Sequence, residues 1–307
     1  MSRISVIIPC LNDAAYIRQA LESVFAQTRL PDEVIVVNGG STDGTLEILA
    51  EYGERVAVFR QEGKGVSRAK NQAARRATGD YLSFLDADDF WYPEKLLRQE
   101  KLMESHTEYG FCSSDVDFFN EDGVLIHAAI SKEKQPRSGE VFPDLFRNNF
   151  ISSATVFLRK SCFEASGGFP EETYYAEDTE LWLRMAKSFQ LGYIPEALAA
   201  YRVREDSRSQ QFNLHYASVE SIHSRLAAEH PEYFQAHPEL LSQARYNLYV
   251  RWGWRNFDIG LCRQARRQYA RALRIYPWKL VPWKYVLLSL LPGCFLKSLR
   301  GLIGRKG

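Results

Sequence analysis

Cysteine is scarce in this sequence and shows no pairing pattern. There are five cysteines among 307 residues, an odd number, and no two of them form a Cys-x-x-Cys pair. This spacing argues against a disulfide framework or a zinc site, so we expect a reducing, cytosolic setting. Met1 leads directly into the strand-like run Ile4–Ile8 without a basic segment before a hydrophobic core, so we also expect no secretory signal. The cysteines are Cys10, Cys112, Cys162, Cys262 and Cys294.

Long apolar runs are also lacking, because crossing a bilayer takes about 20 apolar residues. The apolar segment Tyr285–Leu296 is shorter and is interrupted at Pro292. Acidic residues are nearly absent from residues 251–307, which contain 13 basic residues and one acidic residue, whereas residues 1–250 contain 26 and 37. Such a charge asymmetry indicates a polyanionic partner, either nucleic acid or an anionic membrane surface.

The hydrophobic residues of this basic segment favour the membrane. An apolar run such as residues 286–291 contributes little to phosphate recognition, so we expect no nucleic-acid partner. Aromatic and aliphatic residues interleaved with basic ones are typical of a segment in the interface of an anionic membrane. We therefore expect residues 211–307 to be helical and basic, and to contact the inner face of the cytoplasmic membrane or pack back on the rest of the chain. The residues concerned are Trp278, Lys279, Trp283, Lys284, Phe295, Lys297, Leu299, Arg300, Arg305 and Lys306.

Residues 4–85 alternate short apolar runs with amphipathic stretches. This pattern predicts a Rossmann-like, mostly parallel α/β sheet, with the carboxyl ends of the strands along one edge. Later strand-like runs, at residues 110–119 and 152–158, predict a smaller mixed sheet. The predicted strands of the first sheet are Ile4–Pro9, Glu33–Asn38, Arg55–Arg60 and Tyr81–Leu85, and the predicted helices are Asp13–Gln27, Thr45–Tyr52, Val66–Ala77 and Pro93–His106.

Three carboxylates follow the last of these strands. Asp86 and Asp88 emerge at its carboxyl end, where open α/β sheets bind ligands. Oxygen ligands at positions i and i+2 suit a hard cation such as Mg²⁺ or Mn²⁺, which would bridge to phosphate oxygens. The alternative is an acidic turn in which Asp89 caps the helix that begins near Pro93.

Two further segments place polar groups at the ends of elements. Residues 39–44, Gly-Gly-Ser-Thr-Asp-Gly, follow the second strand and open a helix, where backbone N–H groups can meet phosphate or ribose. A glycine-rich turn of this kind is also common as structural punctuation. Asp178 falls in the first turn of a helix predicted from Glu177 onward, and locally a helix-capping role is sufficient to explain it.

Taken together, these segments resemble the inverting glycosyltransferases of the GT-A fold known as family two, which transfer a sugar from a nucleotide diphosphate. The likeness spans residues 3–205 and rests on several motifs in the same order along the chain. The motifs are Ser5–Asn12, Gly40–Thr45, Phe84–Asp89 as the Asp-x-Asp element, Gly167–Phe169, Glu177-Asp178 and Tyr201-Arg202.

The resemblance implies a transferase domain over residues 1–210, with a nucleotide-binding half (1–89) and an acceptor-binding half (90–210). It implies transfer of a sugar, with inversion, from a nucleotide-diphospho-sugar to a saccharide or lipid-linked acceptor. The donor most common in the family is a UDP-sugar, and the implied setting is surface polysaccharide or glycolipid synthesis. Asp178 would then be the base that deprotonates the acceptor hydroxyl, and Asp86 and Asp88 the ligands of Mg²⁺ or Mn²⁺. The donor-binding residues would be Pro9, Leu11, Asn38, Gly39, Ser41, Asp43, Lys70, Asp86 and Arg204.

Three positions depart from the pattern of many relatives. Asn38 and Gly39 replace two aspartates, the second of which would hold a uracil ring. Lys70 replaces an arginine, with an exposed helical lysine as the alternative to a phosphate contact, and Arg204 replaces a histidine. Two other functions stay open: a non-catalytic nucleotide-sugar-binding scaffold, and a nucleotidyltransferase. The latter would need a glycine-rich loop with a basic residue where this chain has Cys10–Asp13.

Overall fold

The structure analysed is a computed structural model, and the chain divides in it into two compact units. The first unit comprises residues 1–145 and 149–210, and the second comprises residues 146–148 and 211–307. The predicted membrane-contacting residues from Phe295 onward lie outside the described part of the chain. The structure describes residues 2–121, 123–127, 136–173, 175–204 and 211–290.

The first unit is built on strands that are buried on both faces. Every residue of β1 (Ile4–Cys10) and of β4 (Tyr81–Phe84) is buried, as expected for central strands of a parallel sheet covered by helices. β1 pairs in parallel with both β2 (Glu33–Asn38) and β4, and β2 pairs in parallel with β3 (Ala57–Arg60). The resulting order β3-β2-β1-β4 reverses direction between β1 and β4. Such a reversal is where open α/β sheets place their ligands.

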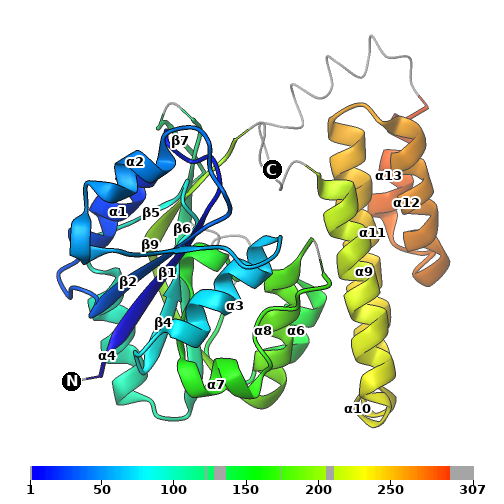
Figure 1. The fold of residues 1–307 in the computed structure, drawn as a ribbon. Coiled ribbons are helices and arrows are strands. Elements are labelled where there is room, and N and C mark those ends of the chain that lie inside the picture. Colours follow the sequence, from blue (N-terminus) through cyan, green and yellow to red (C-terminus); the bar gives the residue numbers. More distant parts are fainter. Residues whose placement is uncertain (1, 122, 128–135, 174, 205–210, 291–307) are drawn as a thin grey trace. The chain divides into compact units, whose positions relative to one another are not determined.

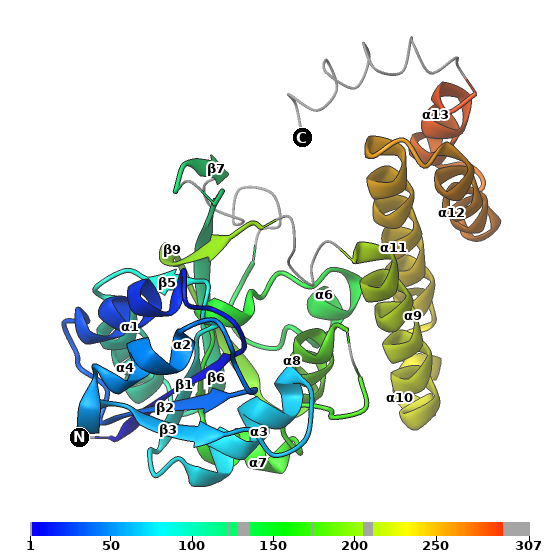
Figure 2. The same cartoon turned by 45° about the horizontal axis from the view of Figure 1, so that its top comes forward.

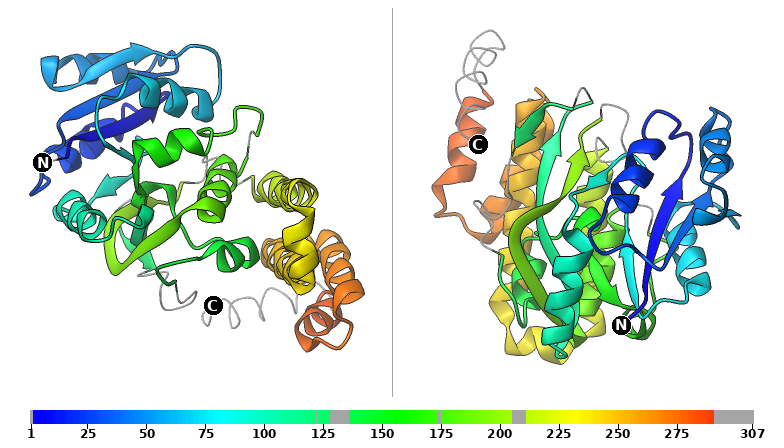
Figure 3. Two further views of the ribbon diagram at one scale, coloured as in Figure 1. Left: turned by 90° about the horizontal axis from the view of Figure 1, so that it is seen from below. Right: turned by 90° about the vertical axis from the view of Figure 1, so that its left-hand side faces the viewer.

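The predicted second sheet is a continuation of the first, which corrects the expectation of a separate one. β8 (Phe157–Arg159) pairs antiparallel with both β4 and β6 (Tyr109–Phe119), so it covers the free edge of β4 and joins the two halves. β6 pairs in parallel with β9 (Gln190–Arg202). The strands of the described residues thus form one curled, mixed, nine-stranded sheet in the order β3-β2-β1-β4-β8-β6-β9-β5, with β7 beside β6 (Figure 3).

Helices cover both faces of this sheet, as right-handed crossovers require (Figures 1 and 2). On one face lie α1, α2 and α4, and on the other lie α3, α7 and α8. The remaining elements of the first unit are α1 (Ile17–Phe25), α2 (Thr45–Ala50), α3 (Val66–Arg76), β5 (Phe90–Trp91), α4 (Lys95–Ser105), β7 (Leu125–His127), α7 (Lys160–Ala165) and α8 (Glu177–Ser188), with 3₁₀ turns at Gly53–Arg55 and Ser153–Thr155; α6 (Phe142–Arg147) runs from the first unit into the second.

The predicted elements of the first half are confirmed, with one difference that matters for the site. The first helix was expected from Asp13 but begins at Ile17. The Asp13 carboxylate accepts a hydrogen bond from the backbone N–H of Leu11, at 2.8 Å, which folds this segment into a loop. The sequence between β1 and α1 is therefore available at the carboxyl edge of the sheet.

The second unit is helical throughout its described part. Its small core contains Phe257, Ala265 and Tyr269, with the ring of Tyr285 stacked on Tyr269 at 5.5 Å. Among the described residues of the chain, no helix has both the length and the apolar character needed to span a membrane. The helices are α9 (Phe212–Glu229), α10 (Pro231–Ala236), α11 (Pro238–Asp258), α12 (Cys262–Ile275) and α13 (Leu280–Leu288).

Candidate active site

The loops that follow β1 and β2 are joined to each other by hydrogen bonds. The backbone N–H of Asn12 donates to Ser41 Oγ at 2.9 Å, and the Asn12 side chain accepts from the Thr42 N–H at 2.9 Å. Asp43 accepts from the Ala14 N–H at 3.0 Å. Its hydrogen bond with the Thr45 hydroxyl is the main cause of its lowered pKa. The two predicted donor-binding segments thus form one rim at the end of adjacent strands.

Asn38, the last residue of β2, stabilises the loop that follows this strand. Its side chain is buried, and its Oδ1 accepts hydrogen bonds from the N–H groups of Gly40 (2.6 Å) and Ser41 (2.8 Å). Gly40 has a φ of +97°, a conformation that glycine adopts without steric cost. An aspartate oxygen could accept the same two bonds, but the Asn38 amide also donates to Ser41 Oγ at 3.2 Å. Asn38 therefore organises the loop through contacts within it.

Lys70 and Asp86 form a buried ion pair at the end of β4. Lys70, in α3, is 3% exposed, and its Nζ lies 2.9 Å from Asp86 Oδ1. Burial alone would lower the pKa of Lys70, but the Asp86 carboxylate, with further contributions from Glu177 and Asp178, raises it above its ordinary value. The alternative of an exposed helical lysine is therefore wrong, because α3 directs this side chain inward to Asp86.

Asp88 lies in an excess of negative charge that one arginine partly relieves. Burial, followed by the nearby carboxylates of Asp86 and Asp13, raises the pKa of Asp88 to about 6. Arg204 Nη1 lies 3.2 Å from Asp88 Oδ2 and 3.6 Å from Asp13 Oδ1. The Arg204 guanidinium also lies over the ring of Tyr16, 4.6 Å from its centroid. A cationic side chain thus lies beside the carboxylate expected to bind a metal.

Asp89 is a structural residue, but it does not cap α4. Glu94 is the residue that precedes α4, and it makes no side-chain capping bond. Asp89 Oδ1 instead accepts from the Arg202 N–H at 2.9 Å, and Arg202 Nε donates to the Asp88 carbonyl at 3.0 Å. Burial and the charge of Asp88 raise the pKa of Asp89 well above its ordinary value. The Tyr-Arg motif at the end of β9 therefore fixes the backbone of the Asp-x-Asp element.

Asp178 lies in the first turn of α8. The helix begins after Ala176, which has a φ of +62°, unusual for a residue other than glycine. Asp178 Oδ1 accepts from the backbone N–H of the next residue, Thr179, at 2.6 Å, which is not a helix-capping bond. The electrostatic effect of Asp178 on Lys70 places this carboxylate near the Lys70–Asp86 pair.

Asn71, next to Lys70 in α3, fixes the turn that precedes α8. Its Nδ2 donates to the Phe169 carbonyl at 2.8 Å, and its Oδ1 accepts from the Phe169 N–H at 2.9 Å. A Cβ on Gly168 would lie 2.8 Å from Asn71 Oδ1, and Gly168 has a φ of +68°. The Gly167–Phe169 motif thus provides the close backbone approach that this double bond requires.

The carboxylates at the end of β4 fit a divalent cation that also binds a diphosphate. Within the described ranges, no cluster of three or more His, Cys, Asp or Glu side chains forms a ready-made metal cage. Mg²⁺ commonly uses one or two protein carboxylates and takes its other ligands from phosphate and water. Asp86 and Asp88 supply two, and burial, followed by the charges of Asp86 and Asp13, raises the pKa of Asp88.

Comparison with known proteins identifies the family. Residues 5–167, more than half of the chain, match the family model described as glycosyl transferase family 2. The chain belongs to glycosyl transferase family 2. The matched range includes both nucleotide loops, the Asp-x-Asp element and the first glycine of the turn before α8, but not Asp178.

Bacterial relatives of this family 2 protein are named as glycosyltransferases. It is 33% identical over 217 residues to the "Putative teichuronic acid biosynthesis glycosyltransferase TuaG" of Bacillus subtilis, covering 67% of this chain and 81% of that protein. It is 32% identical over 208 residues to an "Uncharacterized glycosyltransferase" of Rickettsia bellii, covering 67% of this chain but 29% of the relative. The chain thus spans less than two thirds of the length of several Rickettsia relatives.

Solved structures share the fold of this family 2 chain. The structure of S. aureus TarS residues 1–349 in complex with UDP-GlcNAc has a TM-score of 0.60 and 19% sequence identity, and the match covers 94% of this chain and 90% of that 1–349 chain. At this identity the likeness is one of fold. TarS with UDP, at a TM-score of 0.54, gives the same coverage.

In this family 2 protein, most of the predicted site residues lie at the carboxyl edge of the sheet, and their roles stay a prediction. The loops carrying Leu11, Asn38–Asp43, Asp86 and Arg204 share the carboxyl edge, and Leu11 is 56% exposed there. Pro9 differs, because it lies inside β1 and is buried. Sequence reasoning missed Tyr16 and Ser153, and it named Glu177 only as part of the Glu177-Asp178 motif; an aromatic residue in the loop after the first strand was the available signal for Tyr16.

Proposed function

We propose that this protein transfers a sugar from a nucleotide-diphospho-sugar to a saccharide or lipid-linked acceptor, with inversion at the anomeric carbon. One observation carries the proposal: Lys70, buried at the carboxyl edge of the sheet, pairs with Asp86 at 2.9 Å, and the carboxylates of Glu177 and Asp178 at the start of α8 are near enough to act on its charge. The residues proposed for the donor side and the residue proposed as the base therefore belong to one site. A single displacement requires both to act on the same anomeric carbon.

Asp178 is our candidate for the general base. An acceptor hydroxyl must lose its proton as its oxygen attacks the anomeric carbon, and a carboxylate within hydrogen-bond reach can take it. Asp178 is only partly buried, so an acceptor can approach it at the start of α8. Attack on the face of the anomeric carbon opposite the leaving diphosphate inverts the configuration.

Asp86, Asp88, Lys70 and Arg204 are our candidates for the leaving-group side. As the glycosidic bond breaks, negative charge develops on the nucleotide diphosphate and must be stabilised by positive groups. A Mg²⁺ or Mn²⁺ ion held by Asp86 and Asp88 would supply Lewis-acid stabilisation there. Lys70 forms an ion pair with Asp86, and Arg204 forms one with Asp88. Both cationic side chains would therefore be close to a diphosphate held at this metal site.

A UDP-sugar is our proposed donor, and a surface polysaccharide or glycolipid our proposed product. TarS, which shares the fold, is described in complex with UDP-GlcNAc, and TuaG is named for teichuronic acid biosynthesis. The exposed Leu11 and the loop held by Asn38 would flank the base and ribose, with residues 1–89 as the nucleotide half. Residues 90–210 would form the acceptor half.

We further propose that the second unit makes peripheral contact with the inner face of the cytoplasmic membrane. Large apolar side chains are exposed on α13 and the turn before it, with Leu280 at 79% and Trp278 at 69%. Exposed aromatic and aliphatic groups beside lysines are typical of interfacial helices. This contact would bring the site to lipid-linked acceptors.

The test of the transferase proposal separates binding from chemistry. Thermal-shift measurements with UDP, GDP, CDP and dTDP, each with and without Mn²⁺, identify the nucleotide, and Asp88→Asn should lose the metal-dependent stabilisation. Asp178→Asn should bind the same nucleotide with unchanged affinity but lower turnover of the donor sugar by about 100- to 10,000-fold, the usual contribution of a general base.

Asp258→Asn, an acidic substitution in the second unit, is the matched control and should leave both properties unchanged. Turnover that survives in Asp178→Asn would remove this residue from the base role. Nucleotide binding by the wild type without turnover of any sugar would favour the non-catalytic scaffold instead.

A further inference from the structure

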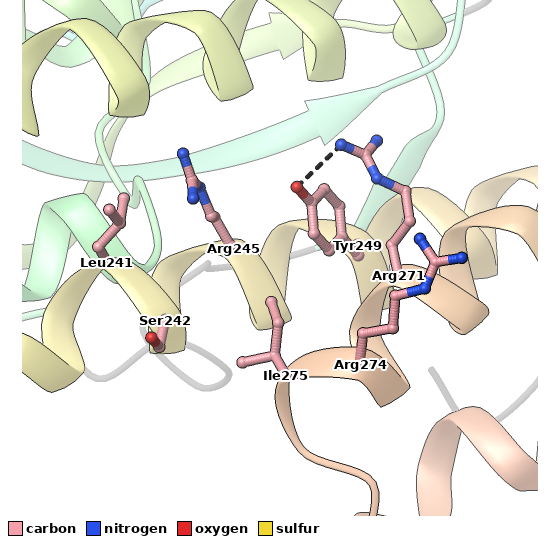
Figure 4. Close-up of a pocket in the computed structure, with 7 residues that line it drawn as sticks. All are labelled: Leu241, Ser242, Arg245, Tyr249, Arg271, Arg274 and Ile275. Atoms are coloured by element: carbon pink, nitrogen blue, oxygen red, sulfur yellow. Dashed lines mark hydrogen bonds between the residues drawn. The ribbon is translucent and has the colours of Figure 1, made fainter.

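The second unit contains a pocket that plays no part in the proposed transfer. It has a volume of about 280 Å³ and lies between α11 and α12. Figure 4 shows that its lining combines three arginines with two aliphatic side chains and two hydroxyl groups. Ligand pockets commonly measure about 300–1,000 Å³, so this one suits a small group. The lining residues are Leu241, Ser242, Arg245, Tyr249, Arg271, Arg274 and Ile275.

Only one of the three guanidinium groups is neutralised by a carboxylate. Arg271 is paired with Glu220 and donates a hydrogen bond to the Tyr249 hydroxyl at 2.9 Å. Arg245 donates to Ser224 Oγ at 3.0 Å, a neutral acceptor. Among the described residues, neither Arg245 nor Arg274 forms an ion pair. The pocket therefore presents two uncompensated positive charges.

This chemistry fits a phosphate group attached to an apolar body. Guanidinium groups bind phosphate oxygens through paired N–H donors, and the Ser242 hydroxyl adds a neutral donor, whereas the Tyr249 hydroxyl already donates to Glu220 at 2.6 Å. Leu241 and Ile275 give the same pocket an apolar side that inorganic phosphate alone would not use. The phosphate of a phospholipid, with the first part of its acyl chains beside it, matches both parts of the lining.

The pocket adjoins the exposed apolar surface of the same unit. The Tyr276 ring packs against Tyr246, next to Arg245 in α11, at 5.3 Å, and its hydroxyl donates to Glu239 at 2.9 Å. The exposed Trp278 ring lies 5.5 Å from that of Tyr276. The start of the apolar surface is therefore fixed on the stretch of α11 that lines the pocket.

We propose that this pocket binds the headgroup phosphate of an anionic phospholipid while Trp278 and the apolar side chains of α13 enter the membrane interface. The inference rests on the membrane contact proposed above and adds a site that would recognise one class of lipid. Charge complementarity and the adjoining apolar surface select a lipid over a soluble phosphate ester. Arg245 and Arg274 carry the headgroup recognition, and Leu280 and Leu287, exposed by 79% and 64%, carry the insertion.

The experiment measures sedimentation of the full chain with vesicles of phosphatidylcholine alone or with about 30% phosphatidylglycerol. We expect binding to the anionic vesicles, reduced about 100-fold or more in the double variant Arg245→Gln/Arg274→Gln, since each hydrogen bond between a guanidinium and a phosphate contributes about tenfold or more. The control Arg263→Gln/Arg267→Gln removes the same charge from exposed positions of the same helix unit and should reduce binding far less. Equal losses in both variants would overturn the pocket in favour of a diffuse electrostatic contact.

Two further arms separate the other outcomes. The first arm adds sn-glycerol 3-phosphate at micromolar concentration to the vesicle mixture. Displacement of the protein from the vesicles would overturn the lipid assignment in favour of a soluble phosphate ester. Trp278→Ala/Leu280→Ala tests the membrane contact itself, and loss of vesicle binding there is expected; unchanged binding would overturn the inserted surface. UDP-dependent thermal stabilisation is measured for every variant, so that failure of the transferase proposal is seen independently of the vesicle result.

Discussion

Arg204 should compete with a divalent cation for the Asp88 carboxylate. Its guanidinium lies 3.2 Å from Asp88 and 3.6 Å from Asp13, so the position beside the metal-binding candidate already holds a positive charge. At an effective dielectric constant of about 20, the attraction between unit charges at 3.2 Å is about 5 kcal/mol. Desolvation of both groups offsets much of this, and a hydrogen bond between charged groups contributes about 1.5–3 kcal/mol net.

A metal ion that binds Asp88 must displace this interaction, so Arg204→Met should tighten Mn²⁺ binding in the absence of nucleotide. The net contribution corresponds to a decrease in Kd of about 10- to 100-fold. Isothermal titration calorimetry of the apo protein at about pH 8 measures it, since Asp88, with a pKa of about 6, is then ionised. The Arg204 charge lowers the pKa of Asp88, so Arg204→Met should raise that pKa. A pH of about 8 keeps Asp88 ionised in the variant as well.

The control is Arg18→Met, which removes an exposed arginine paired with Glu51 at 2.7 Å and should leave Mn²⁺ affinity unchanged. A second titration with UDP and Mn²⁺ together should show the opposite sign, because Arg204 released from Asp88 can then pair with the diphosphate. Mn²⁺ affinity that stays equal or falls in Arg204→Met, without nucleotide, would refute the competition.

Three further predictions concern single buried positions. Burial lowers the pKa of Lys95 from 10.5 to about 7. Between these pH values the unfolded chain binds one more proton than the folded chain, so the free energy of unfolding should rise with pH across that window. Urea unfolding at several pH values should show a smaller rise for Lys95→Met than for the wild type. Gly168→Ala should lower stability by about 2–4 kcal/mol, because its φ is +68° and its Cβ would displace Asn71; denaturant unfolding measures this loss. Lys70→Met should weaken UDP binding about 10-fold or more by calorimetry, because Asp86 would lose its partner and repel the diphosphate.

The parallel half of the fold was predictable because its signals are local. β1 and β2 are short apolar runs with polar residues at their ends, and the right-handed crossover rule then fixes which edge carries Asp86 and Asp88. The single continuous sheet was not predictable, because the pairing of β8 with both β4 and β6 joins residues that are distant in sequence. Strand periodicity reports a buried face but gives no information about the neighbouring strand.

The candidate site shows the same division. Spacing along the chain was sufficient to propose Asp86 and Asp88 as a pair. It could not show that Lys70 is buried, because a lysine in a helix is usually solvated and only the packing of α3 reverses this. The role of Asn38 in its own loop likewise depends on backbone geometry at Gly40 and Ser41, which no composition pattern reports.

The double hydrogen bond between Asn71 and Phe169 makes α3 a mechanical link between the two halves of the reaction. Asn71 holds the turn that leads into α8, while the preceding residue, Lys70, holds Asp86. A rotation of α3 that moves the lysine amine therefore also pulls on the backbone before Asp178. In the proposed transfer, the positions of the donor-side carboxylate Asp86 and of the turn before the candidate base Asp178 therefore both depend on the packing of one helix, α3.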